Sequence, residues 1–363
     1  MEESFSKMEF EVFKRDKDIH QQRALFKECF PENNGTLVES EAHYIWKFHT
    51  FPATPSSYEY GAYFNRKLIG YYAALPFEYV ISGKTIRVGM VCDVMTSVQA
   101  RGKGIFTKLG IYSTESLKEE KLDFTLGYPI RTEVIPGHIK AGWEKLFPLP
   151  LFIKLLRSKN LLKHRRLTIF YPVMDIIIVF YNFLVELIRH KGNYTIENID
   201  SAEIDNINGL GLFFKNWVSE QKIALKKNVD FFKWRLGGPQ KEYRLIIARN
   251  QNEIVGFCVV TEITRENVPS LAILDLSCLN KYDSASGNIL VEVESYARYR
   301  NLDAVLIMAS KYYARKYHLA RNGFLRSPFK FQLILKNLGN NFKMELLRKE
   351  SNWHLTWIDS DDL

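Results

Sequence analysis

One segment of the sequence combines glycines, basic residues and a predicted change from strand to helix. In VCDVMTSVQARGKGIFTKLG (91–110), an apolar strand leads into Gly102 and Gly104, and a helix is expected directly after them. Glycines let the backbone turn so that successive N–H groups point into one concavity, and the helix N-terminus adds unpaired donors and its positive dipole end. Arg101 and Lys103 add full positive charges. The segment therefore predicts a cradle for a pyrophosphate group.

The loop differs from two widespread phosphate-binding loops. It contains neither the G-x-x-x-x-G-K-[ST] pattern nor the G-x-G-x-x-G pattern of dinucleotide-binding folds. A plain tight turn with surface lysines has a similar composition. On this segment alone, a purely structural loop stays open as the alternative.

The elements predicted around the loop belong to an α+β domain. Apolar alternation and turn residues predict a short first strand and then an antiparallel meander of three strands, at 8–14, 58–64, 68–81 and 86–97. Helical spacing and breaker residues predict helices at 18–29, 42–50, 104–121 and 136–143. A short apolar strand is expected at 122–129. This order places the glycine loop between a strand and the helix that covers the sheet.

The loop also resembles a family signature. Gln99-Ala100-Arg101-Gly102-Lys103-Gly104 is similar to the Q/R-x-x-G-x-G/A motif of the GCN5-related N-acetyltransferases, and the order of elements over residues 8–150 resembles the core of that family. The resemblance implies that residues Gln99 to Ile105 bind the pyrophosphate of acetyl-CoA, or of another acyl-CoA, as co-substrate. It also implies that backbone N–H groups near Met95 and Thr96 polarise the thioester oxygen.

A second position extends the resemblance. Family members often carry a tyrosine four residues before a Gly-aromatic pair, and its hydroxyl protonates the leaving thiolate of coenzyme A. Here the pair is Gly142-Trp143, and His138 stands four residues before it. An imidazolium can donate a proton near neutral pH, which makes His138 the candidate general acid. An ordinary polar residue at a helix end is the alternative.

The reaction also needs a base, because an ammonium acceptor must lose a proton before its nitrogen attacks the thioester. Asp93 lies on the predicted cofactor strand, and Glu133 lies in a segment expected to border the acceptor cleft. Either carboxylate could accept the proton, directly or through water. Because acids are rarely buried without a partner, a structural ion pair is the alternative role for Asp93.

The second half of the sequence repeats the order of elements. Strands are predicted at 243–248, 254–262, 271–278, 304–308 and 331–335, with helices at 288–299 and 314–322. The corresponding loop, LNKYDSASGNIL (279–290), has the single glycine Gly287, and Leu319 stands four residues before Gly323-Phe324. Leucine cannot transfer a proton. We therefore predict that the second half is a degenerate copy that closes the acceptor cleft.

The predicted fold class is α+β, with tandem acyltransferase-like folds that each have a mixed, mostly antiparallel sheet flanked by helices. The expected parts are a catalytic domain at 1–150, a helical linker at 151–192, a degenerate second domain at 193–340 and a tail at 341–363. A chain of 363 residues is long enough for two domains.

Composition and charge limit the class of protein further. The chain is 46% hydrophobic and 25% charged, which excludes a disordered protein. Its four cysteines are widely spaced and its eight histidines show no H-x-x-x-H pattern, so we expect no metal and a cytoplasmic location. A net charge of +9 suits a nucleic acid, an anionic membrane or a polyanionic ligand. No zinc-finger, homeodomain or RNP spacing appears, so nucleic acid is not an expected partner.

The linker joins a basic run to the apolar run LTIFYPVMDIIIVFYNFLVELI (167–188). The basic run contains no acid and consists of Lys154, Arg157, Lys159, Lys163, Arg165 and Arg166. Pro172, Asp175, Asn182 and Glu186 interrupt the apolar run, so a transmembrane helix is not expected. We expect a connecting helix buried between the domains. A surface helix lying on anionic lipid, at the inner face of the membrane, is the alternative.

Two further segments suggest an acceptor. FFKWRLGGPQKEYRLIIA (231–248) and NWHLTWIDSDDL (352–363) resemble, more weakly, a subgroup of two-domain members encoded among bacterial cell-surface polysaccharide genes. The resemblance implies a small-molecule amine as acceptor, namely an amino sugar linked to a nucleotide or lipid. A protein or peptide N-acetyltransferase and a non-catalytic acyl-CoA-binding module are the alternatives. Trp353 and Trp357 predict a tail packed on the body, with Asp359 and Asp361 either solvated or near a cationic acceptor.

Overall fold

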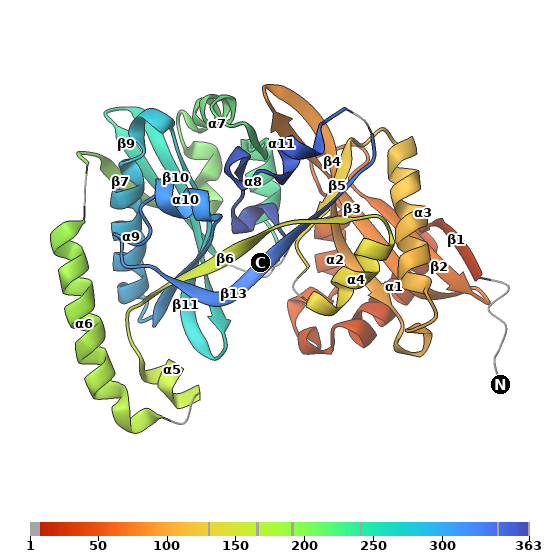
Figure 1. Ribbon diagram of the computed structural model, residues 1–363, viewed down its shortest axis with the longest axis horizontal. Coiled ribbons are helices and arrows are strands. Elements are labelled where there is room, and N and C mark those ends of the chain that lie inside the picture. Colours follow the sequence, from red (N-terminus) through yellow and green to blue (C-terminus); the bar gives the residue numbers. More distant parts are fainter. Residues whose placement is uncertain are drawn as a thin grey trace.

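The computed structural model describes residues 8–129, 131–164, 167–189, 192–239, 242–339 and 341–361. Two lobes lie side by side along the long axis of the molecule (Figure 1). We call residues 8–143 the first half and residues 192–324 the second half. Among the described residues, one mixed and mostly antiparallel sheet runs through both halves, which confirms the predicted α+β class.

The first half has the predicted order of elements. Its strands are β1 (Met8–Val12), β2 (Tyr58–Phe64), β3 (Lys67–Ile81), β4 (Lys84–Thr96) and β5 (Phe124–Gly127), and its helices are α1 (Arg15–Cys29), α2 (Glu41–His49), α3 (Ile105–Glu119) and α4 (Ile135–Lys140). Successive side chains of β3 point to opposite faces of the sheet. Tyr71 therefore packs in the cluster that contains α1 and α2, and Tyr72 packs in the cluster that contains α3.

The second half has a similar order. Its strands are β7 (Thr195–Asp200), β8 (Ile223–Leu225), β9 (Tyr243–Asn250), β10 (Glu253–Arg265), β11 (Val268–Cys278) and β12 (Ala304–Met308), and its helices are α7 (Leu210–Ser219), α8 (Val229–Leu236), α9 (Ala285–Tyr299) and α10 (Lys311–Lys316). The predicted strands of the β9–β10–β11 meander are all present. Helix α9 covers this meander as α3 covers β2 and β3.

Two long strands exchange between the halves. β6 (Glu144–Leu155) leaves the first half, and its residues Leu151–Leu155 pair with β12 of the second half. β13 (Leu325–Asn337) returns from the second half, and its residues 334–337 pair with β5. β6 and β13 also pair with each other and cross between the lobes in Figure 1. The strand β13, which follows the second half, therefore pairs with β5 of the first half. The strand β6, which follows the first half, pairs with β12 of the second half.

Two departures from regular pairing shape the first half. The register of β3 and β4 shifts between the pairs Tyr71–Met95 and Ala73–Cys92, so β4 has a bulge at Asp93, whose φ is +47°. In the described chain, the parallel pairing of β4 with β5 stops at Met90, although β4 continues to Thr96. The two strands therefore separate beyond Met90, on the side from which the glycine loop leaves β4.

The linker forms two helices, α5 (Lys159–His164) and α6 (Tyr171–Ile188). The expectation of a helix buried between two domains is wrong: α6 lies along the outer flank of the second half (Figure 1), and most of its side chains are exposed. Its length and mean hydropathy of 1.7 would permit a membrane span, the sole such helix among the described residues. Arg165 and Arg166 lie outside the described residues.

The C-terminal segment packs into the body, as predicted. It contains α11 (Met344–Arg348) and β14 (Trp353–His354), and β14 pairs with β8. β8 in turn pairs with β3 of the first half. Trp353 and Trp357 are fully buried. The segment thus fastens the second half to the first and ends beside the strands of the first half.

Candidate functional site

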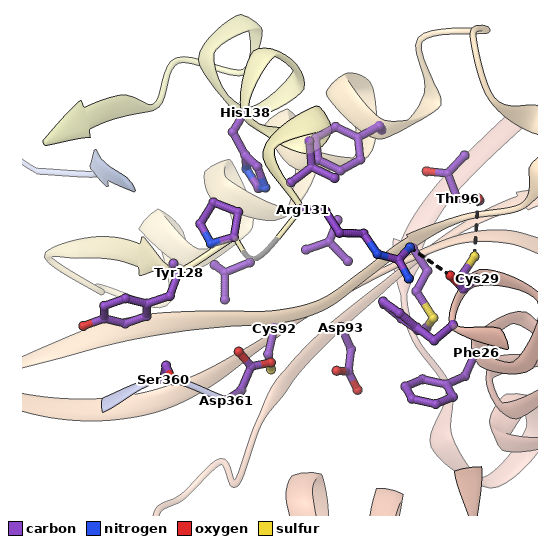
Figure 2. Close-up of a pocket in the computed structure, with 18 of the residues that line it drawn as sticks. Phe26, Cys29, Cys92, Asp93, Thr96, Tyr128, Arg131, His138, Ser360 and Asp361 are labelled. Carbon is purple, nitrogen blue, oxygen red and sulfur yellow. Dashed lines mark hydrogen bonds between the residues drawn. The ribbon is translucent and has the colours of Figure 1, made fainter. Parts of the chain in front are cut away.

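A cavity of about 1130 Å³ lies where β4 and β5 separate. Its walls come from β4, the glycine loop, the start of α3, α4 and helices α1 and α2. The second half contributes Trp234, Arg235 and Tyr243, and the C-terminal segment contributes Ser360 and Asp361. Figure 2 shows labelled residues of α1, β4, α4 and the C-terminal segment around one space. The corresponding position in the second half has a cavity of about 110 Å³, lined by Ser284, Ser286 and Gly287 among others.

The glycine loop opens onto this cavity. Gly102 and Gly104 have φ of +77° and +76°, a region that disfavours side chains, and a Cβ atom at either position would meet no atom within 4 Å. Helix α3 begins at Ile105, and no side chain of the described residues caps its N-terminus. The amides of its first turn therefore face a space large enough for an anion.

The predicted cofactor-binding residues divide into two groups. Met95, Thr96, Ala100, Arg101, Gly102, Gly104 and Ile105 line the cavity. Gln99 and Lys103 belong to the same loop, with exposed side chains outside the lining. The Arg101 Nε atom lies 3.4 Å from the carbonyl oxygen of Thr96, which holds its guanidinium beside the end of β4.

Asp93 lies on the cavity wall and forms an ion pair with a lysine. Its Oδ1 accepts a hydrogen bond from the Lys47 Nζ atom at 2.8 Å, and the same ammonium lies 3.2 Å from Oδ2 of Asp361. Burial alone would raise the pKa of Asp93, but the Lys47 ammonium outweighs burial and lowers this pKa. Burial would lower the pKa of Lys47, and Asp93 raises it above its ordinary value. Asp93 and Lys47 therefore remain charged around neutral pH.

His138 lies between two aromatic rings of the cavity wall. Its ring centroid is 5.0 Å from those of Phe106 and Trp143, both in edge-to-face geometry. Burial lowers the pKa of His138 to about 4. At pH 7 the imidazole is therefore neutral and can donate a ring N–H as a hydrogen bond, but it carries no additional proton. Its role as general acid stays a prediction.

Glu133 and Arg131 lie at an exposed edge of the cavity. The Arg131 guanidinium donates to the carbonyl oxygen of Cys29 at 3.1 Å, pairs with Glu32, and lies 5.0 Å from the Phe30 ring centroid. These contacts connect the segment before α4 to the end of α1. Glu133 is exposed and far less enclosed than Asp93, and its role as base stays a prediction as well.

The second half meets the first across a pair of tryptophans. Trp46 of α2 and Trp234 of α8 stack with centroids 5.4 Å apart and an interplanar angle of 14°. Each indole Nε1 donates to the other's carbonyl oxygen, at 2.7 Å from Trp46 and 3.0 Å from Trp234. The next residues, Lys47 and Arg235, both line the cavity. Sequence reasoning overlooked Lys47, although the repeated dipeptides Trp46-Lys47 and Trp234-Arg235 were a signal for it.

The two tail carboxylates have different environments. Asp361 is partly exposed and lines the cavity. Asp359 is fully buried, accepts hydrogen bonds from the backbone N–H and hydroxyl of Thr356, and has its pKa raised to about 6 by burial. The expectation of a solvated carboxylate is therefore wrong for Asp359, which caps a turn of the tail.

Comparisons with known proteins bear on the domain and the fold. The family model described as an acetyltransferase (GNAT) domain matches residues 14–145. The comparison with curated proteins returned no match. A GCN5-related N-acetyltransferase from Anabaena variabilis has a similar structure, with a TM-score of 0.65, 13% identity, and coverage of 92% of this chain and 73% of that chain.

Two further solved structures show the same fold. A probable N-acyltransferase from Enterococcus faecalis gives a TM-score of 0.61 at 10% identity, over 92% of this chain and 73% of that chain. N-myristoyltransferase from Saccharomyces cerevisiae with bound myristoyl-CoA gives a TM-score of 0.59 at 12% identity, over 92% of this chain and 79% of that chain. Residues 14–145 therefore form an acetyltransferase (GNAT) domain of the kind found in N-acyltransferases, and the chain as a whole shares the fold of these solved structures.

Proposed function

We propose that the protein transfers an acyl group, acetyl by default, from acyl-CoA to the primary amine of a small molecule. The observation that carries this proposal is that the second half and the tail help to line the cavity. The glycine loop belongs to the first half, whereas Trp234 and Arg235 belong to the second half and Asp361 to the tail. These three residues line the same cavity and limit the space available to an acceptor. Concave sites with walls from several parts of a chain favour small ligands over folded polypeptides.

The residues of the first half suit the acyl donor. The open glycine cradle at Gly102 and Gly104, and the uncapped start of α3, would hold the pyrophosphate. The edge of β4 that is released from β5 after Met90 would receive the extended arm and the thioester. When bound, the thioester supplies an activated acyl carbon, and backbone donors near Met95 and Thr96 would polarise its oxygen.

Transfer requires that the amine be neutral at the moment of attack. A base takes the first proton of the ammonium, the C–N bond forms as the C–S bond breaks, and the second proton that the nitrogen loses goes to the thiolate. Asp93 and Asp361 share the single Lys47 ammonium, so one negative charge of this trio is available to attract a cationic acceptor. Asp93, Glu133 or an intervening water would take the amine's proton, and the His138 N–H would stabilise the thiolate.

The acceptor class is the finer part of the proposal. The resemblance of residues 231–248 and 352–363 to proteins of polysaccharide gene clusters favours an amino sugar. Within that proposal, the second half is a degenerate copy that closes the cleft. A peptide amine is the second candidate, because this chain shares its fold with N-myristoyltransferase from Saccharomyces cerevisiae, and the match covers 79% of that protein.

The test is release of free thiol from acetyl-CoA with a panel of amino sugars, their nucleotide-linked forms and lysine- or glycine-terminated peptides. We expect turnover with an amino sugar, and an increase of about tenfold in its KM for Asp361→Asn, because the variant loses a charge that attracts the ammonium. The control is Asp205→Asn, which removes a carboxylate paired with Lys233 outside the cavity lining.

Three outcomes would contradict the proposal. Faster turnover of peptides than of every small amine would support the second candidate. Turnover of no amine, with intact CoA binding, would support an acyl-CoA-binding module. An equal loss of CoA affinity and acceptor use in Asp361→Asn would show that the tail acts on stability and not on the acceptor.

A further inference from the structure

Helix α6 carries its apolar side chains on the face that water would normally wet. The side that packs on the second half contains Ile178, Asn182 and Val185, the buried residues of the helix. The opposite stripe consists of Ile176, Phe180, Phe183 and Leu187, with exposed fractions of 57% to 69%. A surface helix of a water-soluble protein has the reverse arrangement, with its apolar stripe facing the core.

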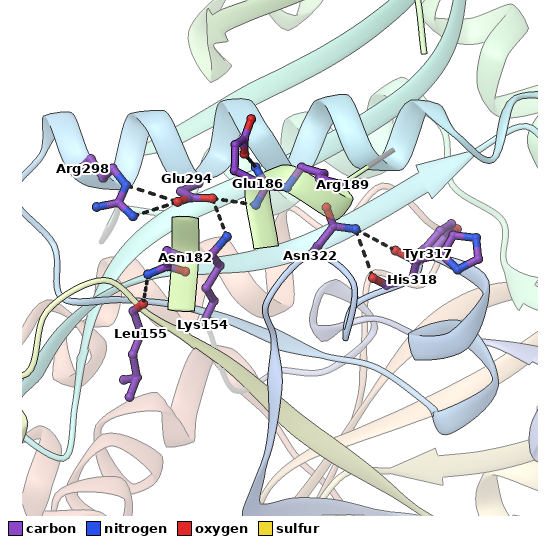
Figure 3. A network of polar contacts seen from close by, with 10 residues as sticks. All are labelled: Lys154, Leu155, Asn182, Glu186, Arg189, Glu294, Arg298, Tyr317, His318 and Asn322. Carbon is purple, nitrogen blue, oxygen red and sulfur yellow. Dashed lines mark hydrogen bonds and ion pairs between the residues drawn. The ribbon is translucent and has the colours of Figure 1, made fainter. Parts of the chain in front are cut away.

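The polar residues of α6 are bonded to the body of the protein. Asp175 Oδ1 accepts hydrogen bonds from both the backbone N–H and the hydroxyl of Ser158, each at 2.7 Å. Asn182 Nδ2 donates to the carbonyl oxygen of Leu155 at 3.0 Å (Figure 3). Asp175 and Asn182, two of the residues that interrupt the apolar run in the sequence, are therefore paired on the protein side, and the opposite stripe of the helix is apolar.

The exposed apolar surface continues beyond the helix. Leu167, Ile169 and Phe170, just before α6, have exposed fractions of 46%, 82% and 55%. Soluble monomers rarely expose contiguous apolar patches of more than a few hundred Å², and larger patches mark interaction surfaces. We call Leu167, Ile169, Phe170 and the exposed side chains of α6 the apolar flank.

The charges around the apolar flank are positive. Residues 151–192 contain eight Lys and Arg and two Asp and Glu, so this segment carries six of the nine net positive charges of the chain. In the sequence, KHRR (163–166) precedes the apolar run and RHK (189–191) follows it. One acid, Glu186, is paired with Arg189 at 3.0 Å, and the other, Asp175, faces Ser158. Lys159 and Lys163 of α5 are exposed.

Several contacts hold α6 against the body along its length. Besides Asp175 and Asn182, Arg189 at its C-terminal end pairs with Glu294 of α9 at 2.8 Å. Figure 3 shows Lys154, Arg189 and Arg298 gathered around this carboxylate. A helix fastened in this way stays parallel to the surface of the protein. It presents one face outwards and does not leave the body to cross a bilayer.

We propose that the apolar flank docks the protein on an anionic membrane surface, with α6 lying in the plane of the interface. Exposed apolar side chains would enter the boundary between headgroups and acyl chains, and the exposed Lys159 and Lys163 of α5 would meet anionic headgroups. A second copy of this chain fits the flank less well, because two copies would bring like charges at the helix ends together. This proposal is independent of the acceptor.

The test is flotation of the full chain with phosphatidylcholine vesicles, with and without phosphatidylglycerol, at low and high salt. We expect flotation with the anionic vesicles that weakens at high salt. Phe180→Gln/Leu187→Gln keeps the net charge but removes two exposed apolar side chains, so we expect about a hundredfold lower partitioning, or about tenfold for each. Ile111→Gln/Leu212→Gln is the control, since it changes two exposed apolar residues of α3 and α7.

The comparison of the two double variants also distinguishes a loss of membrane binding from misfolding. Both double variants change exposed side chains, so each should keep the melting temperature and the thiol release of the unmodified chain. The proposal fails if the unmodified chain stays with the unbound fraction on anionic vesicles, or if Phe180→Gln/Leu187→Gln floats as well as the control. It also fails if sedimentation shows a dimer that this variant dissociates and no vesicle binding occurs.

Discussion

His138 is neutral at pH 7 because burial between Phe106 and Trp143 lowers its pKa to about 4. An unfolded histidine has a pKa near 6.5, so between these values the unfolded chain binds more protons than the folded one. The stability that follows from a neutral His138 is complete above pH 6.5 and declines as the pH falls towards 4.

We therefore predict that replacing His138 flattens the acid side of the stability profile. His138→Phe keeps a ring between Phe106 and Trp143 but cannot be protonated. From pH 7 to pH 4 the unmodified chain should lose up to about 3 kcal/mol more than the variant. Urea unfolding at three pH values measures this difference, because other buried histidines titrate equally in both proteins. Equal slopes would show that His138 is not buried in its neutral form.

The residues of the site were partly predictable. Asp93 was found because an acid inside an apolar strand is unusual, and it does line the cavity. Its partner Lys47 could not be inferred from proximity, since the two are 46 residues apart and meet only when α2 packs on the bulge of β4. Arg235 was equally hidden, because it reaches the cavity from the second half.

At the scale of elements, the connection between β4 and α3 is the unit proposed to hold the donor. Two left-handed glycines, Gly102 and Gly104, turn the chain within the few residues that separate the strand from the helix. A side chain would be strained there in spite of the open space around it.

We predict that Gly104→Val lowers CoA affinity at least tenfold, because the β-branched residue disfavours a positive φ and turns the amides away. Gly83→Val is a matched control. Gly83 has a φ of +82° and open space around it, but lies in the turn between β3 and β4, away from the cavity. Calorimetric titration with CoA compares the two. Equal affinities in both variants would remove the loop from the binding site.

Most elements were predictable where the apolar residues kept one spacing, that of a strand or that of a helix, without interruption. β2, β3, β4, α3 and β12 follow from their sequence patterns within a few residues. β6 was overlooked because Pro148 and Pro150 argue against a strand. The sheet tolerates them because β12 pairs only with Leu151–Leu155, so that edge of β6 asks neither proline for an N–H donor in the described chain; the Pro150 carbonyl oxygen only accepts a hydrogen bond from the backbone N–H of Ala309. The three-residue strand β8 has too little pattern to detect.

At the scale of the molecule, the exchange of β6 and β13 makes the two halves one unit. β5 of the first half has β13 as its second neighbour, and β12 of the second half has β6. Pairings between such distant segments leave no local signal in the sequence, which is why the shared sheet was not predicted.

We predict a single unfolding transition for the full chain and no independent folding of residues 8–150. The fragment lacks β13, which leaves β5 and its apolar face uncovered. Scanning calorimetry on the full chain should give one peak with equal calorimetric and van't Hoff enthalpies. The fragment should show no cooperative transition and should gain one when residues 151–361 are added. Two separate peaks, or a cooperative fragment, would contradict this prediction.

The late return of β13 has a consequence for biosynthesis. A ribosome that has made the glycine loop and α4 has made every backbone donor expected to hold the donor molecule, yet β5 still lacks its second neighbour until residues 334–337 emerge. Ser360 and Asp361 reach the cavity wall later still. A nascent polypeptide that has not yet reached residue 334 therefore has an incomplete pocket, and synthesis must pass residue 361 before the whole cavity lining is present.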